Sequence, residues 1–306
     1  MHIMKLIFDG DSWAFGSEIV DSSVFLQNSN IVDPGEGIEF RVNDRYRVPK
    51  IYSHHMAQQL GCDYVNLGCP SDDNSSIIER TMSYITTEYI RHDKPTDDIL
   101  VIIGWTSPER NNFWWKNSKI SQKIRLHPQS LGKRLLSHPN NCSDQDDQQI
   151  EEFSRMYAVY MWNPEEYIPR YISTIVQFQN FCNAHNIKWL SYNTFYQTPV
   201  LKRLYRNPSG WQDFDVLAEV KKIDKRIGSY YASENGKRKM KDLNIESLWH
   251  TVDPVRFYKK DQPVNTFKSF IDANVDDPYV GLHPSPSGHE AWATELVRYI
   301  KENNLL

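Results

Sequence analysis

The segment 98–105, DILVIIGW, constrains the fold more than any other part of this 306-residue chain. Its apolar residues occupy consecutive positions, so both faces of a strand built from it must be buried. Strands of that kind lie at the centre of parallel sheets that helices cover on both sides. The segment therefore predicts an α/β protein.

Shorter strand and helix patterns alternate around this segment. Further strands are predicted at 3–8, 63–67 and 187–192. Helices are predicted at about 48–60 ending at Gly61, at about 76–91 behind a capping box of Ser76 and Glu79, at 164–184, and after a second capping box of Ser287 and Glu290. The alternation predicts a three-layer α/β/α, flavodoxin-like parallel sheet of about five strands.

Two irregular segments interrupt this alternation, at about 106–162 and 196–262. We expect a single domain over 1–306 that carries them as insertions. If strands 98–105 and 187–192 are parallel neighbours, both insertions leave from the carboxyl edge of the sheet. We then expect them to form the walls of a site at that edge.

Reactive groups of open α/β sheets gather beyond the carboxyl ends of the strands. Ser12 follows the first predicted strand in a Gly-Asp-Ser turn, Gly68 follows the second, and Thr106 follows the third, while His283 precedes the last helix. A serine at such a turn exposes its Oγ, and a loop histidine is then a candidate general base. The structural alternatives are a helix N-cap serine, an ordinary glycine turn, turn residues at the start of an insertion, and a surface histidine. His289, in the first turn of the last helix, is expected to be a surface or capping residue.

Taken in order, these sites resemble the SGNH hydrolases, also called GDSL-type esterases and lipases. The matching residues are Gly10, Asp11 and Ser12, then Asn66 and Gly68, then Gly104, and finally His283, Pro284, Gly288 and His289. The resemblance implies that Ser12 is the nucleophile and His283 its base. It also implies an oxyanion hole made by the N–H groups of Ser12 and Gly68, with Thr106 as a third donor. No metal or organic cofactor is implied.

The chain departs from the family pattern at two positions. Thr106 stands where the family has an Asn, and its hydroxyl has a shorter reach than an amide. Val280 stands where the family has the Asp that orients the imidazole. Either Asp276 or Asp277 folds back to His283, or a backbone carbonyl accepts the imidazole N–H and leaves a dyad. We favour the dyad.

The resemblance implies a serine esterase that acts on a small-molecule or carbohydrate ester, for example an O-acetylated carbohydrate. One alternative is an SGNH-like binding or structural protein without catalysis. Residues 105–110, WTSPER, resemble the third block of SGNH-like proteins of large tailed phages, so a viral origin and a virion role belong to that alternative. The other alternative is an acyltransferase on the same scaffold.

Composition and charge argue against several other classes of protein. The net charge of -4 is unusual for a general nucleic-acid binder, and the basic cluster of Lys237, Arg238, Lys239 and Lys241 is expected to be a solvated surface. The longest apolar run, 99–103, is too short to span a membrane, and the N-terminus does not resemble a signal peptide. We therefore expect a cytoplasmic protein whose four cysteines are reduced, with no metal site.

Overall fold

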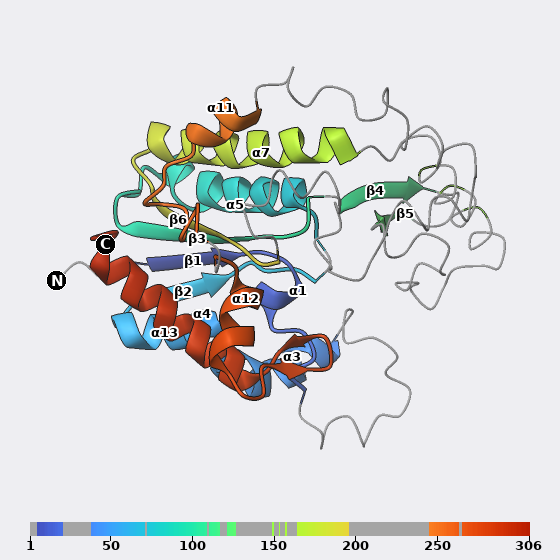
Figure 1. Cartoon of the computed structure of the whole chain (residues 1–306), viewed down its shortest axis with the longest axis vertical. Coiled ribbons are helices and arrows are strands. Elements are labelled where there is room, and N and C mark those ends of the chain that lie inside the picture. The colour runs from blue at the N-terminus through green and yellow to red at the C-terminus, as the bar shows by residue number, and fades with distance from the viewer. Residues whose placement is uncertain are drawn as a thin grey trace. The chain divides into compact units, whose positions relative to one another are not determined.

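The computed structural model describes residues 5–20, 38–70, 72–108, 110–116, 121–126, 149, 153, 157, 164–195, 245–262 and 265–306 (Figure 1). The chain divides into two compact units. The first comprises Met1–Thr106, Val176–Pro199 and Val252–Leu306, and the second comprises Ser107–Ile175 and Val200–Thr251. Every candidate site residue named from the sequence belongs to the first unit.

The first unit is built on a four-stranded parallel sheet. Its strands are β1 (Lys5–Asp9), β2 (Asp63–Asn66), β3 (Ile99–Trp105) and β6 (Lys188–Asn193), in the order β2-β1-β3-β6. All four strands that the sequence predicts are confirmed, with small shifts at their ends. Every residue of β3 is buried, as its uninterrupted apolar run requires.

A short segment lies beside β6 where a fifth strand would be. Ser191 forms a parallel bridge with Phe257, and Asn193 forms one with Thr266. Turns on both sides of Phe257 limit the pairing to isolated bridges. The sheet therefore has four strands and a bridged fifth position. Residues 252–262, which the sequence pattern assigns to the second insertion, belong to the first unit.

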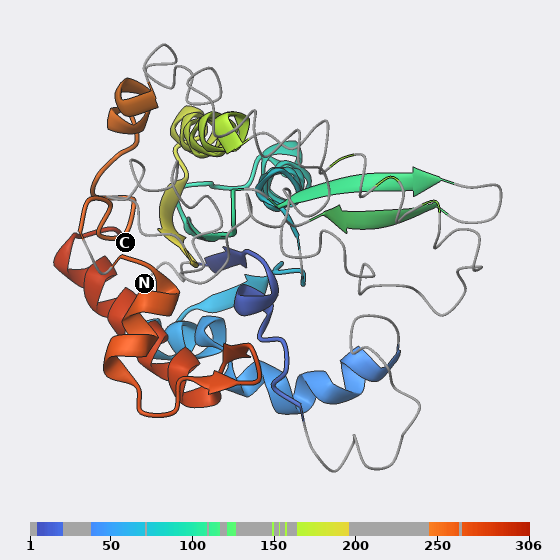
Figure 2. The ribbon, with the colours of Figure 1, turned by 45° about the vertical axis from the view of Figure 1, so that its right-hand side comes forward.

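Helices cover both faces of this sheet, which gives three layers (Figures 1 and 2). On one face α4 (Tyr52–Leu60) and α13 (Pro286–Glu302) pack against each other. On the other face lie α5 (Asn74–Glu88) and the last part of α7 (Pro164–Ala184), where Phe178 packs edge-on against Trp189 of β6. The predicted three-layer α/β/α class is confirmed.

Aromatic rings fill much of the core on the α4–α13 face. Trp292 stacks on Phe267 with ring centroids 4.9 Å apart, and it meets Tyr192 and Tyr258 edge-on at 5.1 and 5.0 Å. All four side chains are fully buried. Aromatic residues make up 13% of the chain, and part of them therefore serves core packing.

Several short elements complete the first unit. They are α1 (Ser12–Phe15), α3 (Ile38–Arg47), η1 (Val48–Lys50), η2 (Ile90–His92), α12 (Phe267–Asn274) and the paired strands β7 (Tyr279–Val280) and β8 (His283–Pro284). Of these the sequence predicts only η1 and most of η2, as the ends of longer helices. Most of the others are too short to show the periodicity on which sequence-based prediction depends.

The second unit contains a regular hairpin where the sequence predicts only an irregular insertion. Its elements are β4 (Asn111–Lys116), β5 (Ser121–Leu126), α11 (Ile245–His250) and the first part of α7. β4 and β5 pair antiparallel. Asn111 Nδ2 donates to the Tyr157 hydroxyl at 2.9 Å, and that hydroxyl lies 2.6 Å from the hydroxyl of Tyr167. This buried chain of hydrogen bonds ties the start of β4 to α7.

Two of the predicted helix caps are wrong by a few residues. The N-cap residue of α5 is Asp73, whose side chain accepts the Ser76 N–H at 2.8 Å. Ser76 therefore lies inside the first turn of the helix and is not its N-cap. α13 is capped by Ser285, with Pro286 at its first position, and not by Ser287. A carboxylate suits the positive end of the helix dipole, and proline suits the first helical position.

The cap assignment can be measured on α5. Asp73→Ala should lower the free energy of unfolding by about 1 kcal/mol, because the Ser76 N–H then loses its acceptor. Ser76→Ala keeps that N–H and should change stability by much less. Urea titrations of the two variants beside the wild type compare them directly. A larger loss in Ser76→Ala than in Asp73→Ala would restore the sequence-based assignment.

The predicted departure points of the two insertions are confirmed. β3 and β6 are parallel neighbours, and Trp105 pairs with Asn193 at their carboxyl ends. Both insertions therefore start from the edge of the sheet at which β1 also ends. That the insertions wall a site stays a prediction. Glu109, Cys142 and the basic cluster at 237–241 lie outside the described residues.

Among the described residues, no helix combines the length and the apolarity that a bilayer crossing requires. Cys62 and Cys182 are free thiols.

Candidate active site

Ser12 is the first residue of α1, directly beyond the carboxyl end of β1. Asp11 caps this short helix, and its Oδ1 accepts the Trp13 N–H at 3.0 Å. The structural alternative of an N-cap serine is therefore wrong. Ser12 is 9% exposed, and in the described part of the chain neither its hydroxyl nor its N–H has a hydrogen-bond partner. Its Oγ is thus available for chemistry.

Gly10 allows β1 to turn into α1 within a confined space. A Cβ at this position would lie 2.7 Å from the Ala14 Cβ and 3.0 Å from the carbonyl oxygen of Gly104. Side chains do not approach that closely, so the turn requires glycine. The glycine of the Gly-Asp-Ser turn therefore holds Ser12 close to the end of β3.

Thr106, the predicted third oxyanion donor, is engaged within the protein. Its Oγ1 donates to Asp11 Oδ2 at 2.6 Å, and both residues are buried. The Asn74 side chain accepts the Thr106 N–H at 2.9 Å and donates to the Thr106 carbonyl at 3.2 Å. In this structure Thr106 therefore links the ends of β1 and β3 to the start of α5.

Gly68, the predicted second donor, is also engaged. Its N–H donates to Asn66 Oδ1 at 2.9 Å. Asn66 Nδ2 in turn donates to the Ala14 carbonyl at 2.8 Å, so the loop after β2 is tied to α1. Of the three predicted donors, Ser12 N–H is the one that makes no hydrogen bond with a described residue.

His283 begins β8 and is brought close to α1. α1 and β8 are in contact, and Trp13 of α1 packs edge-on against Tyr279 of β7 with ring centroids 5.9 Å apart. The structure therefore places Ser12 and His283 on contacting elements at the carboxyl edge of the sheet. No hydrogen bond joins the two side chains in this arrangement.

The carboxylate beside His283 is Glu18, which no sequence pattern indicated. Glu18 Oε2 lies 3.0 Å from His283 Nδ1. Asp276 and Asp277 are both exposed, and neither carboxylate contacts the imidazole. The β7–β8 hairpin explains why the aspartates do not reach the imidazole. Val280 pairs with His283 near the tip of the hairpin, whereas Asp276 and Asp277 precede β7 at the open end of the hairpin. Of the carboxylates considered, neither Asp276 nor Asp277 therefore lies beside His283, and the carboxylate that does is Glu18.

A buried ion-pair cluster lies under the Gly-Asp-Ser turn and was also missed. Arg80 of α5 binds the carboxylates of Asp9 and Asp72. The Gly10 N–H and the Thr81 hydroxyl each donate to Asp9 at 2.7 Å. Burial raises the pKa of Asp9 to about 6, although the charge and hydrogen bonds of Arg80 act in the opposite direction. A carboxylate at the end of a buried strand needs a partner, but sequence pattern does not show which cation provides it.

His289 is a core residue, so the expectation of a surface or capping histidine is wrong. Its ring stacks on Tyr52 at a centroid distance of 6.0 Å, and its Nδ1 accepts the Tyr52 N–H at 3.3 Å. Complete burial lowers the pKa of His289 to about 3, and the nearby His55, His283 and Arg47 add to this effect. His289 is therefore neutral near pH 7.

The depressed pKa of His289 predicts a pH dependence of stability. The unfolded chain binds the proton near pH 6.5 and the folded chain near pH 3, so stability is complete above about pH 6.5 and is lost as the pH falls below it. This group should contribute a loss of about 1.4 kcal/mol per pH unit in that window. His289→Gln should flatten the slope in urea titrations between pH 7 and 5. An unchanged slope would show that folded His289 takes up its proton normally.

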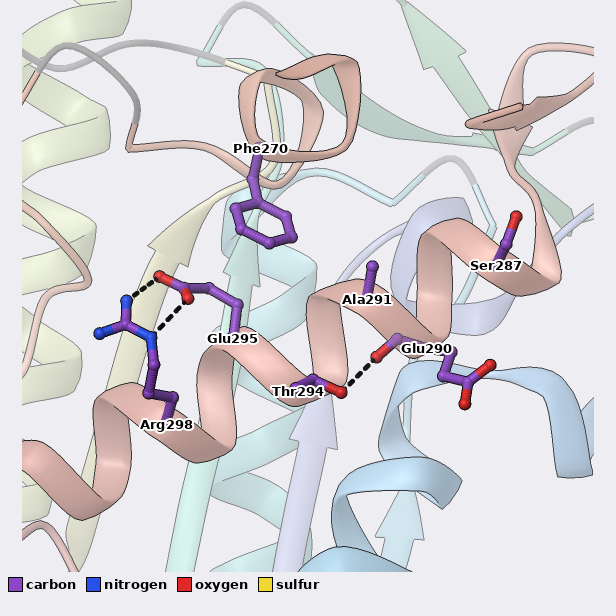
Figure 3. Close-up of a pocket in the computed structure, with 7 residues that line it drawn as sticks. All are labelled: Phe270, Ser287, Glu290, Ala291, Thr294, Glu295 and Arg298. Atoms are coloured by element: carbon purple, nitrogen blue, oxygen red, sulfur yellow. Dashed lines mark hydrogen bonds and ion pairs between the residues drawn. The ribbon is translucent and has the colours of Figure 1, made fainter. Parts of the chain in front are cut away.

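An open hollow of about 410 Å³ lies elsewhere on the first unit, along α13 (Figure 3). Its lining residues are Phe270, Ser287, Glu290, Ala291, Thr294, Glu295 and Arg298. Arg298 binds Glu295 through two hydrogen bonds of 2.7 and 2.9 Å. Neither Ser12 nor His283 lines this hollow. Across the described residues, no group of three or more His, Cys, Asp or Glu side chains is placed to hold a metal ion.

Solved structures that resemble this chain include lipases and esterases at low identity. One is a lipolytic protein of the G-D-S-L family from Desulfitobacterium hafniense DCB-2, at 10% identity and a TM-score of 0.39, with 97% of this chain and 99% of that chain covered. Another is the acetyl xylan esterase Est2A from the rumen bacterium Butyrivibrio proteoclasticus, at 12% identity and a TM-score of 0.43, with 99% of this chain and 65% of that chain covered. A third is a GDSL-like lipase from Parabacteroides merdae ATCC 43184, at 12% identity and a TM-score of 0.36, with 99% of this chain and 96% of that chain covered. Likenesses this weak carry no conclusion about activity. No curated protein matches the chain.

One protein-family model matches the chain, over residues 36–229. The match includes Gly68 and Thr106, whereas Ser12 and His283 lie outside it. Because it spans more than half of the 306 residues, the chain belongs to the family described as Family of unknown function (DUF6071).

Proposed function

We propose that this protein is a serine ester hydrolase with Ser12 as nucleophile and His283 as general base. One observation carries the proposal: a serine hydroxyl without a hydrogen-bond partner among the described residues starts α1, and α1 contacts the strand that carries His283. A serine is a weak nucleophile until a base removes its proton, and an imidazole is the usual base.

The chemistry proceeds by acyl transfer through Ser12. As Ser12 Oγ attacks the ester carbonyl carbon, its proton moves to His283 Nε2, and the carbonyl oxygen becomes an oxyanion. Collapse of this intermediate expels the alcohol, which takes the proton from the imidazole, and water then releases the acid by the same steps. The Ser12 N–H is the donor available to the oxyanion. The Gly68 N–H joins it only when Asn66 Oδ1 releases its hydrogen bond.

A fluorophosphonate probe tests the nucleophile without knowledge of the substrate. The probe should label one residue, and peptide mapping should place the label on Ser12. Ser17→Ala is the matched control, because Ser17 lies in the turn after the same helix, and this variant should label as the wild type does. Labelling that persists in Ser12→Ala would refute the assignment.

The substrate class proposed is a small or carbohydrate ester. A panel that compares p-nitrophenyl acetate, longer acyl esters and acetylated oligosaccharides ranks the acyl length and the alcohol by kcat/KM. Adding an acceptor alcohol and analysing the products distinguishes hydrolysis from acyl transfer to that acceptor.

One observation supports a second candidate function: two of the predicted oxyanion donors already form hydrogen bonds within the protein. The Gly68 N–H and the Thr106 hydroxyl both bind groups of the protein itself, so two of three expected donors are occupied. This arrangement suits a protein that binds its ligand without turnover. Equal background rates for wild type and Ser12→Ala across the ester panel, together with no probe labelling, would favour this second function.

A further inference from the structure

Glu18 occupies an unusual backbone position just after α1. Its φ is 65°, in the left-handed region that residues other than glycine rarely adopt. Such conformations persist where the surrounding structure holds them, and they gather at functional sites. The neighbouring Ile19 is buried, at 2% exposure, and fixes the turn to the core. The backbone position of Glu18 is therefore well defined.

The Glu18 carboxylate is directed at the tip of the β7–β8 hairpin. Glu18 Oε2 accepts the Leu282 N–H at 2.8 Å and lies 3.0 Å from His283 Nδ1. His283 Nδ1 is buried from solvent, and among the described residues it forms no hydrogen bond of good geometry. The 3.0 Å approach of Oε2 to Nδ1 is off the line of an ideal N–H···O bond, and catalytic hydrogen bonds are often poorly aligned in the absence of substrate.

The hairpin is shaped to admit this carboxylate. Gly281 has a φ of 59°, and a Cβ added to it would overlap the Glu18 carboxyl group. Glycine therefore suits the positive φ, and any side chain here would displace the Glu18 carboxylate from its present position. The contact is too exposed to be explained by stability, because the Glu18 side chain is 41% exposed and exposed ion pairs contribute little.

We propose that Glu18 is the positioning residue for His283, in the role that Val280 cannot fill. This inference rests on the proposed function. The carboxylate holds the proton on Nδ1, which leaves the Nε2 lone pair to accept the proton of Ser12 Oγ. When Nε2 takes that proton, the negative charge of Glu18 stabilises the imidazolium and takes up no proton itself. The site is then a triad and not the dyad that the sequence favours.

Glu18→Gln is the sharpest kinetic test, because it keeps the shape and removes the charge. Oε2 makes both contacts, so the Gln oxygen in its place still accepts the Leu282 N–H and still faces Nδ1, and the variant removes only the negative charge that stabilises the imidazolium. We expect kcat to fall by up to about 10⁴-fold in Glu18→Ala, which removes the acceptor as well, and by less in Glu18→Gln, with KM nearly unchanged. Glu18→Asp should recover part of the rate. Glu88→Gln, which removes an exposed carboxylate from α5, is the matched control and should keep the wild-type rate.

A spectroscopic readout separates this inference from the proposed function. The ¹⁵N shifts of His283 should show the proton on Nδ1 in the wild type and in Ser12→Ala, and a loss of this preference in Glu18→Ala, which removes the acceptor. Gly281→Ala should move the shifts in the same direction by displacing the carboxylate.

The two failures look different. If Ser12 is not the nucleophile, probe labelling is absent from Ser12 while the tautomer still depends on Glu18. A His283 tautomer and a kcat that are both unchanged in Glu18→Ala, with Ser12 still labelled, would overturn the role of Glu18 alone.

Discussion

Replacing Ser12 by alanine is expected to lower kcat by about 10⁶-fold, the loss typical of removing the nucleophile of a serine hydrolase. The midpoint of thermal unfolding should stay close to that of the wild type. Both expectations follow from the same observation, because the Ser12 hydroxyl has no hydrogen-bond partner among the described residues, and its removal leaves no such group unpaired. Hydrolysis of p-nitrophenyl acetate and thermal melts measure the two quantities.

His283, the proposed base, provides the control. His283→Ala should lose a comparable factor, and the double variant should lose little more than either single one, because residues that act as a unit are strongly non-additive. Losses that add across the two positions would mean that the residues act independently. A Ser12→Ala variant that keeps the wild-type rate would assign the activity to another group.

Replacing Arg80 by methionine is expected to cause a large loss of stability, about 3–5 kcal/mol. Asp9 is completely buried and Asp72 is 1% exposed, so the change leaves two carboxylates without their common cation. Methionine keeps most of the aliphatic length of arginine, which limits the packing defect. Urea titration at pH 7.5 measures the loss.

The pH dependence identifies the charge as the cause. The pKa of Asp9 is about 6 in the folded protein and near 3.8 when unfolded, so folded Asp9 holds its proton more tightly. Acidification through pH 6 therefore favours the folded state at this group, and a protonated Asp9 has less need of Arg80. The stability lost in Arg80→Met should shrink at pH 5. Asp9→Asn/Arg80→Met should be more stable than Arg80→Met at pH 7.5, and an equal stability would attribute the loss to packing.

The sheet could be predicted because burial on both faces leaves a clear trace in the sequence. The run from Ile99 to Ile103 has no polar residue, and every position of β3 is buried. Helix starts were harder, because Asp73 and Ser76 are both good caps and lie close together. The structure selects Asp73, which a propensity argument alone does not separate from its neighbour.

Only those residues of the candidate site that lie next to the ends of predicted elements could be predicted from the sequence. Ser12 and His283 come from the two ends of the chain, yet both were placed from strand-end position and family resemblance. The role of Thr106 was not, because its hydroxyl binds Asp11, and such a pairing depends on the distance between two strand ends. The position of Glu18 could not be predicted either, because its contact with His283 joins two segments far apart in the sequence and leaves no periodic pattern.

The placement of these groups along the chain has a consequence for the order of synthesis. Ser12 and Glu18 lie in one short stretch after β1, whereas His283 comes from a hairpin that follows every strand of the main sheet. A ribosome therefore releases the nucleophile and the carboxylate long before the imidazole. Until the hairpin emerges and docks on α1, the nascent chain holds Ser12 without His283. Under the proposed function, hydrolytic competence would arise only after the sheet has been translated, and the unfinished protein would not act on esters around it.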